Sequence, residues 1–158
     1  MDHQTHIAIQ QKSFEPAEEY AQLEADTPEI GAICTFVGLA RSFGDRPDVT
    51  GLYLEHYPGM TENSIAALIR QARERWKLDA VRVVHRVGVI NLGERIVFVG
   101  ASSAHRADAF AACEFLMDYL KTQAPFWKKE RTTAGEHWVE QKASDRERAR
   151  RWDTQEDS

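Results

Sequence analysis

Apolar residues recur along the chain with two different periods, and the changes of period predict the order of strands and helices. Apolar or alternating runs of strand length occupy residues 7–10, 31–38, 49–57, 80–87 and 95–101. Within the run 49–57, Leu52 and Leu54 fall on one face, as the two-residue period of a strand requires. The polar stretch 41–48 is rich in Gly, Pro and Asp and is predicted to be a loop.

Two longer segments have the helical period. The first begins at Met60, and its apolar stripe consists of Ile65, Leu68, Ile69, Ala72 and Trp76. The second is expected over about 104–122, with a stripe of Ala109, Phe110, Cys113, Leu116, Met117 and Leu120. Ser102 and Ser103 offer N-cap hydroxyls at its start. Pro125 follows its end, because proline disfavours the helical conformation of the preceding residue.

The lengths of the connections indicate how some strands pair. Residues 88–94 are too few for a helical crossover and are predicted to form an irregular turn. The strands 80–87 and 95–101 on either side of it are therefore expected to be antiparallel neighbours. Residues 126–132 and 137–139 are predicted to form a last hairpin.

Together with a short helix over 15–23, these elements predict an α+β fold. We expect a single-domain α/β sandwich, in which helices pack on a largely antiparallel sheet and the chain finishes with a C-terminal hairpin. A chain of 158 residues, 42% of them hydrophobic, suits one compact domain. We assign 1–152 to this domain and 153–158 to a charged tail. The mixed charges of 141–158 are typical of a surface helix or a frayed tail.

Charge and hydropathy argue against several classes of protein. The net charge of −5 argues against a dedicated nucleic-acid binder. No apolar run approaches the ~20 residues that span a membrane, and residues 1–4 lack a signal pattern, so a cytoplasmic protein is expected. Cys34 and Cys113 lie in apolar segments without the spacing of a metal or redox pair. They are expected to be buried, reduced thiols.

The segment 102–106, Ser-Ser-Ala-His-Arg, is the first candidate for chemistry, because it follows a strand and opens a helix. Unpaired N–H groups at a helix N-terminus favour an anion. His105 adds a titratable donor and Arg106 a fixed cation. The competing interpretation is a solvated arginine and a satisfied histidine at a capped helix end.

The segment 121–131 is the second candidate. It contains four cations and one acid, with Phe126 and Trp127 between them; the cations are Lys121, Lys128, Lys129 and Arg131. Such a cluster suits a planar anionic ligand, and a lysine among other cations can act as a nucleophile or as an acid–base group. The competing interpretation is an exposed basic turn. Glu55 and His56 receive little weight, because alternation places them on opposite faces of their strand.

Arg106 and Lys121 lie fifteen residues apart on one predicted helix, and at ~1.5 Å per residue they are separated by roughly 22 Å. A small substrate cannot contact both within one straight helix. Either the two residues serve different sites, or a dimer brings Arg106 of one copy to Lys121 of the other. We favour a shared site at the interface of a two-fold dimer.

From about residue 7 to residue 152 the sequence resembles the large, catalytic subunits of molybdopterin synthase. Three long blocks carry the resemblance: Leu-Glu-His-Tyr-Pro-Gly-Met at 54–60, Val-Phe-Val-Gly-Ala-Ser-Ser-Ala-His-Arg at 97–106, and Met-Asp-Tyr-Leu-Lys-Thr-Gln-Ala-Pro-Phe-Trp-Lys-Lys-Glu at 117–130. The resemblance implies a hammerhead-like fold and a heterotetramer, with a homodimer of large subunits at its centre and a small ubiquitin-like sulfur carrier at each end.

The family's reaction is implied in the same way. The C-terminal Gly-Gly thiocarboxylate of the carrier would enter a pocket of this chain, and two sulfur transfers to cyclic pyranopterin monophosphate would form the molybdopterin dithiolene. The resemblance implies neither a metal nor another cofactor in this step. Exclusion of water would protect the acyl intermediate from hydrolysis.

Matching positions imply the roles of individual residues. Lys121 would meet the terminal carbonyl of the carrier, and Lys128 would assist in substrate binding and proton transfer. The other positions implied for substrate binding are Arg41, Phe36, Met117, and the pair His105 and Arg106 supplied by the neighbouring subunit. The loop 39–48 has no matching block beyond Arg41, and Gln123 stands where a basic residue is expected.

Two other functions are compatible with the sequence. The chain could be a non-catalytic scaffold that binds the tail of a ubiquitin-like partner, although retention of the implied site residues argues against this. It could also be a nucleic-acid or phosphate-binding module that uses the cluster 121–131, which the acidic net charge disfavours.

Overall fold

The computed structural model describes residues 4–24, 27–41, 48–139 and 143–153. Within them the elements are β1 (Thr5–Gln10), α1 (Pro16–Ala21), β2 (Ala32–Leu39), β3 (Val49–His56), α2 (Met60–Arg75), β4 (Val81–Arg86), β5 (Gly88–Asn91), β6 (Arg95–Ser103), α3 (Arg106–Leu120), β7 (Phe126–Thr132), β8 (Gly135–Val139) and α4 (Ala143–Asp153). The predicted order of elements is confirmed, and β5 is an additional strand.

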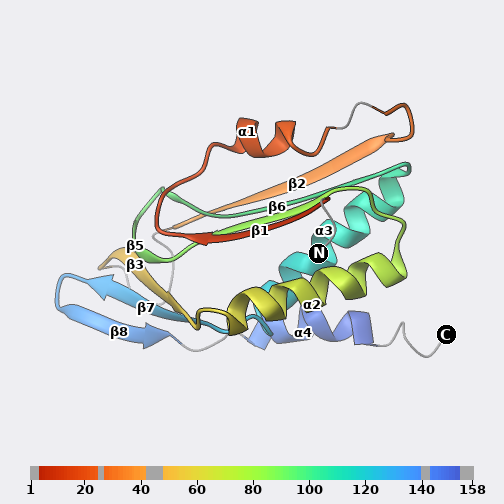
Figure 1. Ribbon diagram of the computed structural model, residues 1–158. Helices are drawn as coiled ribbons and strands as arrows, with labels where there is room; N and C mark the ends of the chain where they lie inside the picture. The colour runs from red at the N-terminus through yellow and green to blue at the C-terminus, as the bar shows by residue number, and fades with distance from the viewer. Residues whose placement is uncertain (1–3, 25–26, 42–47, 140–142, 154–158) are drawn as a thin grey trace.

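The strands form two four-stranded sheets, with the orders β1-β4-β6-β2 and β5-β3-β7-β8 (Figure 1). All pairs are antiparallel except β1 with β4, which is parallel. The α+β class, the antiparallel pairing of β4 with β6 and the β7–β8 hairpin are confirmed. The protein therefore contains two sheets, whereas the sequence predicted helices packed on a single sheet.

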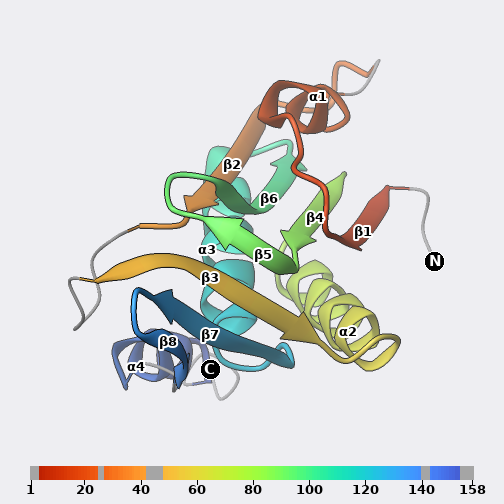
Figure 2. The same cartoon turned by 90° about the vertical axis from the view of Figure 1, so that its left-hand side faces the viewer.

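Helices cover both faces of the first sheet. In Figure 1, α1 lies on one face, while α2 and α3 lie on the other. The main core fills the space beneath α2 and α3, and its largest fully buried side chains include Phe115, Ile65 and Ile69. A smaller cluster under α1 contains Phe14 and Phe98. Figure 2 shows the second sheet beside the first, with β3 leading to the start of α2.

The segment 88–94 was expected to be an irregular turn, and this prediction is wrong for its first half. Residues 88–91 form β5, which pairs with β3 in the second sheet. The cause is apolar burial: Ile90 is fully buried and packs with Leu52 and Leu54, which lie on one face of β3 as predicted. A Cβ at Gly51 would lie 2.7 Å from the carbonyl oxygen of Ile90, so only glycine permits this close pairing.

The start of α3 differs from the prediction. Its N-cap is His105, without a side-chain capping bond. Ser102 and Ser103 instead end β6 as buried residues: the Ser102 hydroxyl accepts a hydrogen bond from the Ala80 N–H at 2.9 Å, and the Ser103 hydroxyl donates one to the Lys77 carbonyl at 2.6 Å. These hydroxyls fasten the end of β6 to the loop between α2 and β4.

The apolar stripe of α3 is confirmed except at Phe110: Ala109, Cys113, Leu116 and Leu120 are buried, and Met117 packs partly buried against the core. Phe110 is 63% exposed, although it was assigned to the stripe. The buried face is centred on Ala112, Phe115 and Leu116, and the rotation of about 100° per residue carries Phe110 past its edge. Cys113 is buried as expected, whereas Cys34 is only partly buried; both are free thiols.

The C-terminal helix α4 is docked on α3 (Figure 1). Trp152 is buried and packs edge-on against Phe115, with ring centroids 5.6 Å apart. Its indole N–H donates a hydrogen bond to the Asp118 carboxylate at 2.8 Å, and Arg151 pairs with the same carboxylate at 2.7 Å. Of the two alternatives for 141–158, a helix is therefore confirmed over 143–153. Residues 154–158 lie outside the described residues, so the domain boundary at 152 stays a prediction.

Candidate active site

The turn between α3 and β7 carries the first predicted lysine. Lys121 is the C-cap residue of α3, and its side chain is exposed. The N–H groups of Thr122 and Gln123 donate to the Tyr119 carbonyl at 3.1 and 2.7 Å, which closes the end of the helix. Pro125 prevents its continuation.

The same turn is braced by the start of α2. The hydroxyl of Thr61, a fully buried residue, donates a hydrogen bond to the Pro125 carbonyl at 3.0 Å. That hydroxyl also accepts a bond from the Tyr57 N–H at 2.9 Å. The position of the turn is therefore fixed by the segment that leads into α2, about sixty residues earlier in the chain.

The strand β7 carries the second predicted lysine. Phe126 pairs with His56 of β3, and Lys128 pairs with the buried Leu54. Because side chains alternate along a strand, Phe126 and Lys128 lie on the same face. The opposite face carries Lys129, whose ammonium lies 4.3 Å from the centroid of the Trp138 ring.

The cluster 121–131 is thus divided between two faces of the second sheet. Lys128 lies on the face toward the first sheet, whereas Lys129 and Arg131 lie on the outer face. Lys129 is also 3.8 Å from Glu136 of β8. The structure therefore separates Lys129 and Arg131 from the face of β7 that carries Lys128.

Two histidines lie in this region: His85, which the sequence analysis did not single out, and His56, which it did. The His85 ring stacks on Phe126, with centroids 4.0 Å apart and planes inclined by 18°. Burial is the main cause that lowers the pKa of His85 to about 4; its hydrogen bond to the Arg86 carbonyl opposes this, and the charges of Lys121 and His56 add to it. His56, which received little weight, lies 3.6 Å from Glu62. The charge of Lys121 therefore acts on the stacked His85–Phe126 pair, and Lys128 follows Phe126 on the same face of β7.

The sequence offered one faint indication of His85. It is a titratable residue at an alternating position in the apolar run 80–87, between the buried Val84 and Arg86. Its partner Phe126 lies 41 positions further along the chain, so only the folded structure reveals the contact.

Phe36 lies within the edge strand β2, three residues before its end, and Arg41 lies two residues beyond that end. Phe36 is 42% exposed, and its ring lies over Gly38, where an added Cβ would be 3.3 Å from it. Arg41 is exposed and follows Ala40, whose backbone bonds to Gly93 and Glu94 fix the point where the loop departs. Residues 42–47 of this loop lie outside the described residues.

His105 and Arg106 lie at the opposite end of α3 from Lys121, and both are exposed. The fifteen-residue helix makes the separation roughly 22 Å, so one chain does not bring the two groups together. Met117, one turn before Lys121, is partly buried against the main core. The structure thus places the His105–Arg106 group and Lys121 at opposite ends of α3.

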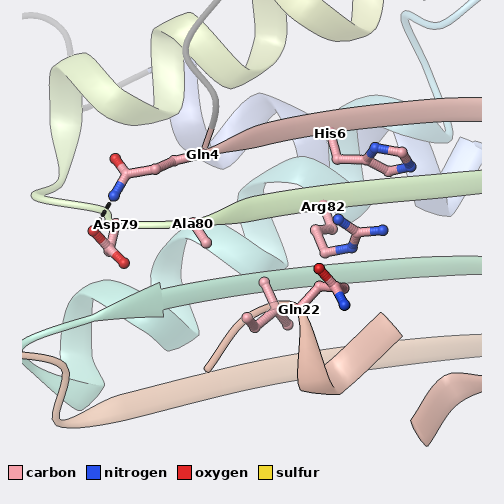
Figure 3. Close-up of a pocket in the computed structure, with 7 residues that line it drawn as sticks. Gln4, His6, Gln22, Asp79, Ala80 and Arg82 are labelled. Atoms are coloured by element: carbon pink, nitrogen blue, oxygen red, sulfur yellow. Dashed lines mark hydrogen bonds between the residues drawn. The ribbon is translucent and has the colours of Figure 1, made fainter. Parts of the chain in front are cut away.

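A pocket of about 230 Å³ lies elsewhere, on the α1 side of the first sheet (Figure 3). It is lined by Gln4, His6, Gln22, Leu23, Asp79, Ala80 and Arg82. Arg82 is paired with Glu19 of α1 at 2.7 Å. None of the predicted site residues lines this pocket.

Within the described ranges, no helix is long and apolar enough to cross a membrane. In the same part of the chain, no group of three or more His, Cys, Asp or Glu side chains is arranged to hold a metal ion. The fold is that of an α+β protein with two sheets, and the turn and strand that carry Lys121 and Lys128 adjoin the contact between His85 of the first sheet and Phe126 of the second.

Comparison with known proteins identifies the family. The family model of the MoaE protein matches residues 9–123. The molybdopterin synthase catalytic subunit of Vibrio cholerae is 52% identical over 97% of this chain and 100% of its own length. That of Pseudomonas aeruginosa is 50% identical over 93% and 98%. The solved structure of the molybdopterin biosynthesis MoaE protein from Burkholderia ambifaria has a TM-score of 0.80 and 46% identity, covering 94% of this chain and 97% of its own.

The chain belongs to the MoaE protein family. The resemblance seen in the three sequence blocks is thereby confirmed. Relatives at about 50% identity are catalytic subunits by name, and the chain is accordingly an enzyme subunit.

Proposed function

We propose that this chain is the catalytic subunit of a molybdopterin synthase. It transfers sulfur from the C-terminal thiocarboxylate of a small ubiquitin-like carrier to cyclic pyranopterin monophosphate, and two such transfers form the dithiolene of molybdopterin. The observation that carries the proposal is the 52% identity to a molybdopterin synthase catalytic subunit over that protein's whole length. The basic site at the meeting of the two sheets gives it a chemical basis.

The substrates explain why the site contains several cations. A thiocarboxylate and a phosphate are both anions, and cations in a partly enclosed site stabilise them more than they would in bulk water. Lys121, at the exposed end of α3, meets the terminal carbonyl of the carrier. Lys128, on the inner face of β7, binds the substrate and transfers protons.

Three further residues contribute to substrate binding. Arg41 supplies a cation at the start of the loop after β2, and Phe36 and Met117 form apolar walls. Phe36 is suited to this role because its ring remains 42% exposed beside Gly38. A planar pterin can stack on such a ring.

The site is completed by a second copy of the chain. His105 and Arg106 lie too far from Lys121 of their own chain to contact the same small substrate. In a two-fold dimer, each copy gives its His105–Arg106 group to the lysines of the other. The N-terminus of α3 then binds the substrate phosphate. The working assembly is a heterotetramer with one carrier at each end.

The proposal also places the protein in the cytoplasm. A reducing compartment is consistent with Cys34 and Cys113, which are both free thiols.

The test is conversion of cyclic pyranopterin monophosphate by the purified protein and carrier thiocarboxylate. We expect product from the wild type and a loss on the order of 100-fold or more for Lys121→Ala. Lys77→Ala is the control, because Lys77 is an exposed lysine in the loop after α2. Carrier binding without product in the wild type would indicate a non-catalytic scaffold instead.

A further inference from the structure

The ring of His85 is held from two directions by groups of different strands. It belongs to β4 of the first sheet, and its face stacks on Phe126 of the second sheet at a centroid distance of 4.0 Å. Its Nδ1 lies 2.8 Å from the Arg86 carbonyl oxygen. A carbonyl only accepts hydrogen bonds, so Nδ1 carries the hydrogen and the neutral ring keeps its lone pair on Nε2.

The turn that carries Lys121 is fixed against the same place. It begins at the C-cap of α3 and ends at Phe126, which rests on the imidazole. Between these points, the Pro125 carbonyl is held by the Thr61 hydroxyl at 3.0 Å. The turn between Lys121 and Phe126 is therefore held at both ends and in its middle, next to the His85 ring.

Packing alone does not account for a histidine at this position. A phenyl ring would stack on Phe126 equally well, without the cost of removing imidazole nitrogens from water. What a phenyl ring lacks is an uncharged acceptor. A flexible lysine ammonium donates three hydrogen bonds and needs such acceptors to adopt one orientation.

The described neighbours of His85 in its own sheet offer no side-chain partner to its second nitrogen. They are Ile9 of β1 and Val97 of β6, which are apolar. The charged or titratable groups whose charges act on it are Lys121 and His56, and His56 itself lies near Glu62.

We propose that His85 is a positioning residue for Lys121, whose ammonium it orients by accepting a hydrogen bond at Nε2 while its Nδ1–H and its ring face are fixed by Arg86 and Phe126. This inference rests on the sulfur-transfer function proposed above, and it adds a residue to the same site. Nε2 of a neutral ring accepts from the ammonium without adding charge to a site that must bind anions.

The kinetic test compares two substitutions at one position. His85→Phe keeps the stack and removes the acceptor, whereas His85→Gln restores an acceptor oxygen at a similar distance. In the assembled enzyme with carrier thiocarboxylate, we expect His85→Phe to lower kcat roughly tenfold or more with KM changed less than about twofold. His85→Gln should recover most of kcat. His6→Phe, a histidine on the α1 face of the same sheet, is the control and should match the wild type.

The second readout does not require catalysis. The rate of acetylation of Lys121 is measured by mass spectrometry at several pH values. Its dependence on pH should differ from that of the wild type in His85→Phe and should match the wild type in His85→Gln. If His85→Phe does not fold, His85→Asn replaces it, because that amide still donates to the Arg86 carbonyl but is too short to reach Lys121.

The outcomes separate this inference from the proposed function. If the wild-type enzyme forms no product, the proposed function is contradicted. The acetylation of Lys121 then still tests the role of His85. Wild-type kcat and acetylation in His85→Phe, or equal losses in His85→Phe and His85→Gln, overturn the role of His85.

Discussion

Lys128 and Lys129 are adjacent in β7, yet their side chains leave the strand on opposite faces. Lys128 shares its face with Phe126 and the inner side of the sheet, while Lys129 lies over the ring of Trp138 at 4.3 Å on the outer side. Two residues of the same type, one position apart, therefore have different environments.

This difference gives a matched pair of variants. Lys128→Ala should lower product formation on the order of 100-fold, because it removes a cation from the proposed site. Lys129→Ala should keep wild-type turnover, because the contacts it removes are on the outer face. Both are measured as initial rates with carrier thiocarboxylate, and equal losses in the two variants would contradict the assignment of Lys128.

The proposed dimer predicts complementation between two inactive variants. Lys121→Ala and Arg106→Ala, mixed after dissociation and reassembly, should regain about a quarter of wild-type activity, since half of the dimers are then mixed and each has one intact site of two. Each variant alone remains inactive. A site built within one chain would give no recovery on mixing, which would rule out the shared arrangement.

Asp118 makes a testable contribution to stability, because it joins α3 to α4. Its nearly buried carboxylate receives bonds from Trp152 and Arg151. Asp118→Asn should lower the free energy of unfolding by about 2–3 kcal/mol, the range for hydrogen bonds to a charged group. Glu114→Gln is the control in urea titrations. Glu114 pairs with Arg151 from an exposed position, so its effect should be below about 1 kcal/mol. Similar losses of unfolding free energy in Asp118→Asn and Glu114→Gln would show that burial of the Asp118 carboxylate does not add to stability.

His85 should make the stability of the protein depend on pH. Its pKa in the folded chain is about 4, below the ordinary value of 6.5. Between these values the unfolded chain binds a proton that the native chain excludes, so stability falls as the pH drops from 6.5 to 4, by on the order of 2–3 kcal/mol. Chemical denaturation at several pH values measures this slope.

His85→Phe should flatten the slope in that range. His6, whose pKa is lowered first by burial and then by Arg82, contributes with the same sign and is present in both proteins, so their difference isolates His85. An unchanged slope in the variant would contradict the lowered pKa of His85.

Cys113 should resist alkylation in the native protein. Burial, followed by the neighbouring Cys34, raises the pKa of its thiol well above the usual range, so almost no thiolate forms near pH 8. We expect iodoacetamide to modify it at least about 100-fold more slowly in buffer than in urea, as quantified by mass spectrometry of its peptide. Rapid native modification would show that the thiol is accessible and ionised.

Much of the fold follows from local patterns. The stripes of α2 and α3 and the alternation of Leu52 and Leu54 reflect burial on one face, which periodicity records directly. β5 escaped prediction because four residues are too few to establish a period, and Ile90 joins the core only through its pairing with Leu52. Phe110 shows a related limit, since apolar character does not decide which edge of a stripe is covered.

The site was less accessible to sequence reasoning than the fold. The resemblance supplied Lys121 and Lys128, but the segment between them is fixed by Thr61 of α2, which holds Pro125, and by His85 of the first sheet, which stacks on Phe126. Contacts of this kind join residues that are far apart in the sequence, and no local pattern records them.

The position of Trp152 has a consequence for the folding of this protein during its synthesis on the ribosome. Its indole packs against Phe115 and Trp76, so the principal core is not closed until the last turn of α4 has been synthesised and has left the exit tunnel. Until then, the aromatic interior of the nascent chain is exposed to water or to a chaperone. Premature termination even a few codons before position 152 would release a polypeptide with an unsealed interior.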